Sequence, residues 1–156
     1  MRFVGEMVPG VQPALGMSAG SNCQRYAYAV LAQFGRHIPP LRSAELWADL
    51  GYTETVEAPE PLDVVLYAPT AEPFGAHAGI WLGDGQILHL CEEVGTPVVW
   101  SQDDFDARDS YRTRIGFKRA LPAVEHDYEV QIRMTGSPTS GDRVTCKMAQ
   151  LEVTYA

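Results

Sequence analysis

The sequence has few cysteines, few cationic residues and no long apolar run. Its three cysteines show no CxxC spacing, which excludes a disulfide framework and a paired-cysteine zinc ribbon and leaves at least one thiol free. No apolar segment reaches the roughly 20 residues of a membrane helix. Glu6 and Pro9 interrupt the stretch where a signal peptide would be apolar. We therefore expect a cytoplasmic protein with no membrane partner, unless another route delivers it outside the cell.

Positive charge is scarce and scattered. Lys and Arg total 12 against 20 Asp and Glu, so the formal net charge is -8, and the basic residues form no stripe. Nucleic acid is therefore not an expected partner. The chain of 156 residues is 46% hydrophobic, enough for one buried core, so a single domain is predicted. The oligomeric state is not determined by these features.

Three segments differ in pattern along the chain. Residues 1–20 mix Gly, Pro and small residues without periodicity and are predicted to form an N-terminal arm. Residues 21–121 are predicted to form the main domain. Residues 122–156 contain two stretches of alternating apolar residues, which predict a C-terminal hairpin extension packed on that domain.

Two helices are predicted to precede the strands of the main domain. The first begins at Asn22, an N-cap type, carries an apolar stripe and stops at Gly35, which places Cys23 in its first turn. The second is predicted over Ser43 to Leu50. Helices followed by strands imply an α+β fold with an antiparallel sheet.

Short apolar runs predict strands at residues 63–67, 78–82, 86–90 and 97–100. Alternating apolar and polar residues predict an amphipathic strand around residues 111–118, with Lys118 on its polar side. Asp103 to Asp109 is predicted to be an acidic connector, and the three tryptophans, Trp47, Trp81 and Trp100, are expected in the core.

The hairpin between the second and third of these strands contains two histidines. A three-residue loop at Gly83-Asp84-Gly85 would pair residues whose numbers sum to 168. His77 would then face Cys91, and His89 would lie on the same face as His77. A two-residue loop would separate the histidines.

A thiol at a helix N-terminus is exposed to the positive end of the helix dipole and to free N–H groups, both of which lower its pKa. Cys23 has this position, so we expect an activated thiol. The alternative is a small apolar residue packed under the sheet.

Four sequence features resemble the NlpC-type bacterial cell-wall peptidases over about residues 20–119: Asn22-Cys23 on a helix, Ser43-Ala44-Glu45 opening the next helix, Leu62-Asp63-Val64-Val65 entering a strand, and the hairpin from His77 to His89. The resemblance implies a papain-like fold over residues 21–121, with Cys23 as nucleophile, His77 as its base and His89 as the residue that orients His77. It also implies a peptide or cell-wall fragment as substrate, cleaved after a γ-linked D-glutamate, and no cofactor.

The sequence departs from that family beside the nucleophile. Asn22-Cys23-Gln24-Arg25 stands where the family has Asp-Cys-Ser-Gly, and residues 11–20 lack the tyrosine that the family places near the oxyanion. The N–H of Cys23 is the expected first oxyanion donor, and the second is not identified. Gln24 and Arg25 are expected on an exposed helix face, although Arg25 could serve specificity.

Several readings of these residues remain open. The first is a cysteine amidase or endopeptidase, the second an acyltransferase or deamidase using the same thioester, and the third a non-catalytic binding module. A zinc site formed by Cys23, His77, His89 and Cys91 ranks below catalysis, because His-x-Cys is not a usual ligand spacing. We expect neither a metal nor a cofactor.

Overall fold

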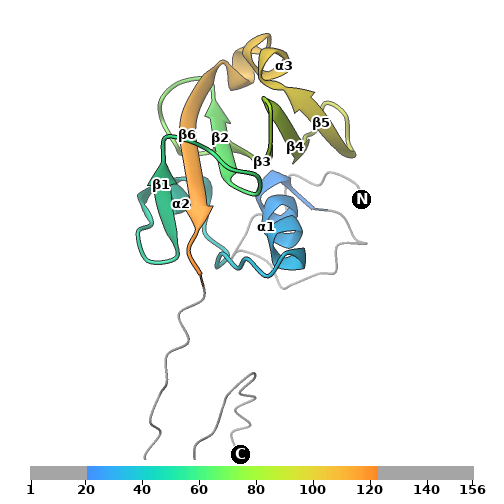
Figure 1. Ribbon diagram of the computed structural model, residues 1–156. Helices are drawn as coiled ribbons and strands as arrows, with labels where there is room; N and C mark the ends of the chain where they lie inside the picture. The colour runs from blue at the N-terminus through green and yellow to red at the C-terminus, as the bar shows by residue number, and fades with distance from the viewer. Residues whose placement is uncertain (1–20, 123–156) are drawn as a thin grey trace, which may run out of the picture. The chain divides into compact units, whose positions relative to one another are not determined.

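The computed structural model describes residues 21–122, which form a six-stranded antiparallel sheet with short helices (Figure 1). The strands are β1 (Thr53–Val56), β2 (Val64–Ala68), β3 (His77–Gly83), β4 (Gln86–Leu90), β5 (Pro97–Ser101) and β6 (Thr113–Ala120), in the order β1-β6-β2-β3-β4-β5. The helices are α1 (Cys23–Gln33), α2 (Ser43–Ala48), α3 (Gln102–Asp106) and the 3-10 helix η2 (Asp109–Tyr111).

Helix α1 begins as its sequence predicts. The side chain of Asn22 is the N-cap and accepts a hydrogen bond of 3.0 Å from the N–H of Arg25. Cys23 is therefore the first residue of the helix. Helix α2 begins at Ser43 as predicted but ends at Ala48, two residues earlier than Leu50.

The sheet is buried on both faces. On one face, Val64 and Leu66 of β2 pack with Ala27 and Leu31 of α1. On the other, alternate residues of the same strands, such as Tyr67, join a second apolar cluster. Because β2 is central and covered on both faces, all five of its residues are buried, which explains its continuous apolar run.

The hairpin of β3 and β4 has the predicted register but reaches it differently. Its turn holds two residues, Asp84 and Gly85, both with positive φ, and Gly83 pairs with Gln86. A bulge between Trp81 and Gly83 then shifts the register by one residue. The next pairs therefore sum to 168, as predicted, and one of them joins Gly79 to His89. The pairing stops there, so His77 and Cys91 do not form a pair in this ladder.

Two parts of the sheet were not predicted correctly. Strand β1 is absent from the predicted strands, and it pairs with β6 from Thr53↔Ala120 onward. The acidic connector is instead the two short helices α3 and η2. Ser101 caps α3 by accepting from the N–H of Asp104, and Phe105 turns inward, fully buried.

Lys118 is buried, which contradicts its predicted place on the polar side of β6. Its Nζ donates hydrogen bonds to the carbonyl oxygen of Asp49 (2.6 Å), the C-cap of α2, and to that of Trp47 (3.4 Å) in the last turn of α2. It also donates to Oγ1 of Thr55 (3.2 Å). The ammonium thus satisfies carbonyls that the end of a helix leaves without partners. The ring of Trp47 packs against Gly116, where a Cβ would come within 2.6 Å of the ring, so this position requires a glycine.

The predicted arm at residues 1–20 lies outside the described residues, as does the predicted hairpin beyond residue 122. Within residues 21–122, no helix is long and apolar enough to cross a membrane.

Candidate active site

The two histidines of the hairpin are joined by a buried hydrogen bond. Nε2 of His77 lies 2.9 Å from Nδ1 of His89, with the rings almost perpendicular at 89°. His77 is 8% exposed and His89 is fully buried. The pairing of Gly79 with His89 sets this geometry, and it requires a glycine: a Cβ on Gly79 would lie 2.4 Å from Cγ2 of Ile87.

An aromatic wall that the sequence did not reveal surrounds the two imidazoles. Phe105 of α3 has its ring centroid 4.7 Å from that of His89, Trp100 of β5 lies at 4.4 Å from His89, and Tyr111 of η2 lies at 4.8 Å from His77. The only sequence signal was the presence of Phe105 and Tyr111 within and after an otherwise acidic stretch. The prediction of an acidic connector over Asp103 to Asp109 therefore missed this wall.

Burial among these rings keeps both histidines neutral. It lowers the pKa of His77 to about 3, with a smaller contribution from His89. Burial, together with a smaller contribution from the charge of Arg108, lowers the pKa of His89 to about 4, while Glu93 acts in the opposite direction. At neutral pH the pair is therefore uncharged and shares one proton across the hydrogen bond.

Cys23 is half-buried where α1 meets the first residues of β3. Burial raises the pKa of its thiol, although the backbone N–H groups of Ala78, Gln24 and Cys23 itself act on the sulfur in the opposite direction. The expectation of a lowered pKa is thus wrong in direction, because desolvation outweighs the helix N-terminus. The contact with Ala78, which directly follows His77 in the chain, places the thiol near the first residues of β3.

Gln24 is buried, which contradicts its expected place on an exposed helix face. Its side-chain Nε2 has no hydrogen-bond partner among the described residues, and neither does Nε2 of His89. Unpartnered buried N–H groups are uncommon in folded proteins, and they concentrate where a ligand or a reacting group supplies the partner. Both atoms belong to residues at or next to the predicted catalytic positions.

The residues 21–122 hold no group of three or more His, Cys, Asp and Glu arranged to bind a metal ion. The zinc site considered for Cys23, His77, His89 and Cys91 is therefore not formed in this part of the chain. Of the three tryptophans expected in the core, Trp81 and Trp100 are buried and Trp47 is partly buried against the core cluster of α1 and β2.

Two depressions of the surface differ in their relation to this site. One, of about 490 Å³, is lined by the following residues: Glu92, Glu93, Arg108, Asp109, Ser110 and Tyr111. Because Tyr111 also packs on His77, this depression adjoins the histidine pair.

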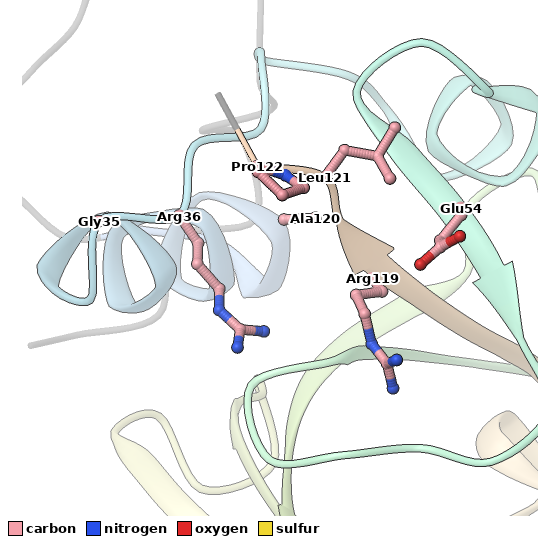
Figure 2. A pocket seen from close by; sticks show the side chains of 7 residues that line it. All are labelled: Gly35, Arg36, Glu54, Arg119, Ala120, Leu121 and Pro122. Carbon is pink, nitrogen blue, oxygen red and sulfur yellow. The ribbon is translucent and has the colours of Figure 1, made fainter. Parts of the chain in front are cut away.

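The other depression, of about 340 Å³, lies just after the C-terminal end of α1, at Gly35 and Arg36, and shares no lining residue with the first (Figure 2). Arg36 and Arg119 point into it, with Glu54 close by. The charge of Arg119 is paired, because Asp63 accepts two hydrogen bonds from its guanidinium, at 2.9 and 2.8 Å, and Glu60 lies 3.5 Å away.

Comparison with solved structures supports the fold. The chain is similar to an NlpC/P60 family protein from Bacillus cereus ATCC 10987, with a TM-score of 0.51 and 19% sequence identity. The similarity covers 66% of this chain and 32% of that one, so the chain spans about a third of its neighbour. No family model matches the sequence, and no curated protein matches it. The mixed fold with an antiparallel sheet agrees with the predicted class, and the likeness at this identity concerns the fold alone.

The two neutral histidines predict a pH dependence of stability. Their pKa values of about 3 and 4 lie below the unfolded value of about 6.5. The unfolded chain therefore binds more protons as pH falls below 6.5, so stability is full above that pH and is lost on acidification toward the folded values. The free energy of unfolding should fall by up to about 1.4 kcal/mol per pH unit for each histidine.

Urea unfolding between about pH 7 and pH 5 measures this slope. His89→Gln keeps an acceptor for His77 and removes one titrating group, so about half of the slope should disappear, whereas His37→Gln, at an exposed loop position, should leave it unchanged. An unaltered slope in His89→Gln would show that the histidine pair is not the source.

Proposed function

We propose that the chain is a cysteine hydrolase, an amidase or endopeptidase, in which Cys23 is the nucleophile, His77 its general base and His89 the residue that orients His77. The observation that carries this is the buried 2.9 Å hydrogen bond between Nε2 of His77 and Nδ1 of His89, at the start of β3, where the backbone N–H of Ala78 acts on the Cys23 sulfur. Thioester chemistry requires a nucleophile, a base within its reach and a group that orients the base.

The single proton between the imidazoles decides which nitrogen acts as base. If His77 donates its Nε2 proton to Nδ1 of His89, its Nδ1 keeps a lone pair and can accept the thiol proton. The thiolate then attacks the amide carbonyl, and His77 returns the proton to the departing amine as the thioester forms. Water, deprotonated by the same nitrogen, hydrolyses the thioester and releases the acid.

The proposed reaction starts from a neutral thiol on Cys23 and a neutral imidazole on His77. Burial raises the pKa of Cys23 and lowers that of His77, so proton transfer accompanies the attack instead of preceding it. His77 then acts as a general base, a role that contributes about 10² to 10⁴-fold in rate.

The oxyanion would be held from the start of α1. The N–H of Cys23 is one donor, since the first residues of a helix have free N–H groups. The unpartnered amide of Gln24 is the second donor that we propose, because it is buried, adjacent to the nucleophile and otherwise unsatisfied. It would replace the upstream tyrosine that the sequence lacks.

We propose a short peptide or cell-wall fragment as the substrate class. The likeness in fold to an NlpC/P60 protein supports this, as does the depression beside Tyr111. One observation favours a second candidate, a binding module without catalysis: the raised pKa of Cys23 leaves the resting thiol unactivated.

Incubation with a muropeptide digest and with a library of short peptides, read by mass spectrometry, tests catalysis. The wild-type chain should release products heavier in sum by one water per cleaved bond, and Cys23→Ala should lose this turnover while still folding, because a half-buried thiol is replaced by a smaller group. Cys91→Ala is the matched control and should retain turnover.

Turnover that persists in Cys23→Ala would contradict the assignment of the nucleophile. Products that carry an added amine in place of water would assign acyl transfer to the same site. Binding of a fragment without any product would select the non-catalytic module.

The proposed role of Gln24 predicts a kinetic signature. Gln24→Met keeps the length of the side chain and removes the donor, so kcat should fall about 10² to 10³-fold with KM little changed. Stability should not fall, because the lost amide group has no partner in the folded state. Gln33→Met, on an exposed position of the same helix, is the control, and an unchanged kcat in Gln24→Met would exclude this donor.

A further inference from the structure

Tyr111 connects the larger depression to the histidine pair. Its ring centroid lies 4.8 Å from that of His77 and 5.6 Å from that of Phe105, so it extends the aromatic wall over His77. The same side chain lines the depression of about 490 Å³. Phe105 is fully buried, whereas Tyr111 is only partly buried. Within residues 21–122, Tyr111 is therefore the one ring that contacts His77 and also lines this depression.

The hydroxyl of Tyr111 is available to a ligand. No hydrogen bond within the described part of the chain uses this hydroxyl, and it is not one of the buried polar atoms that lack a partner, so it is open to solvent. The hydroxyl of Tyr28, in contrast, donates to the carbonyl oxygen of Leu41 at 2.7 Å. A tyrosine with its ring against the protein and its hydroxyl toward water is a common contact residue at binding sites.

The backbone on both sides of Tyr111 is anchored. Its own N–H donates to the carbonyl oxygen of Arg108 at 2.9 Å, and the guanidinium of Arg108 donates two hydrogen bonds, of 2.7 and 2.8 Å, to the carboxylate of Glu93. On the other side, Nε of Arg112 donates to the carbonyl oxygen of Pro69 at 3.0 Å. The ring is thus positioned before a ligand arrives, which lowers the entropic cost of binding.

The charges of the depression determine which ligand groups it accepts. Its lining contains the carboxylates of Glu92, Glu93 and Asp109 and one guanidinium, that of Arg108. Arg108 is paired with Glu93, and no ion pair within the described residues neutralises Glu92 or Asp109. A ligand carboxylate would therefore be repelled from this depression, whereas an uncharged peptide group would not.

We propose that Tyr111 is a substrate-contacting residue, whose hydroxyl forms a hydrogen bond with an uncharged peptide group of a substrate bound in this depression. This rests on the proposed function, in which Cys23 and His77 act on the amide of that substrate. Burial raises the pKa of Tyr111 to about 12, and the thiols of Cys91 and Cys23 act in the same direction. The hydroxyl therefore remains protonated at neutral pH and can donate to a peptide carbonyl.

Alkylation of Cys23 tests this contact without any turnover. Three reagents are compared: iodoacetamide, iodoacetyl-alanine amide, which adds an uncharged peptide group, and iodoacetyl-alanine, which adds a carboxylate. In each case the sulfur bonds to the CH2 carbon, iodide leaves and the thiol loses its proton. Each rate, resolved by peptide mass mapping, is divided by the rate of the same reagent with free cysteine. The normalised rate should be about tenfold higher for iodoacetyl-alanine amide than for iodoacetamide, and lower for iodoacetyl-alanine than for its amide.

Tyr111→Phe keeps the ring over His77 and removes the hydroxyl. The ratio of the iodoacetyl-alanine amide rate to the iodoacetamide rate should therefore fall about three- to tenfold, while the iodoacetamide rate itself stays within about twofold of the wild type. Tyr52→Phe, at an exposed tyrosine between α2 and β1, is the matched control and should leave the ratio unchanged. Glu92→Gln should raise the rate of iodoacetyl-alanine without changing that of the amide.

An unchanged ratio in Tyr111→Phe would overturn the proposal, as would an equal loss with iodoacetamide, which would indicate an effect on the thiol or its base. A second measurement does not depend on the thiol: N-acetyl-alanine amide added to Cys23→Ala should shift the ring NMR signals of His77, and less so when Tyr111→Phe is also present. Equal shifts in both proteins, or none in either, would also overturn it. Because neither readout needs turnover, each can fail while the muropeptide and peptide screen succeeds, and the reverse.

Discussion

The buried hydrogen bond between His77 and His89 is the constraint on which the rest of the site depends. Two imidazoles without charge can share only one proton, so the bond has a direction as well as a length of 2.9 Å. The bulge in β3, the absence of a side chain at Gly79 and the ring of Phe105 all hold these two rings in place. The proposed nucleophile, Cys23, comes from a different element, the first turn of α1.

Local signals predicted the parts of the fold that local geometry determines. Asn22 predicted the start of α1 because its side chain caps the helix, and Gly85 with Asp84 predicted the turn because positive φ is needed there. The register of the hairpin was predicted from an assumed three-residue loop at Gly83-Asp84-Gly85. It was correct although the turn is one residue shorter than expected, because a bulge compensates.

Long-range packing determined what the sequence could not predict. Lys118 is buried because carbonyls 69 to 71 residues away need donors, and Phe105 turns an acidic stretch into a wall of the site. The pKa of Cys23 depends on how much of the thiol is buried, a property that the helix N-terminus alone does not determine. Gln24 is buried because it lies on the same face of α1 as Ala27 and Leu31, which is covered by the rest of the domain.

The most direct test of the account is the rate of iodoacetamide alkylation of Cys23 between about pH 5 and pH 7, resolved by peptide mass mapping with Cys91 and Cys146 as internal references. A thiol that passes its proton to His77 should react at a rate nearly independent of pH in this range, because the proton stays within the pair. In His77→Ala the rate should rise about tenfold per pH unit, as for a thiol that ionises alone. A tenfold rise per unit in the wild-type chain as well would contradict the claim that His77 is the base of Cys23.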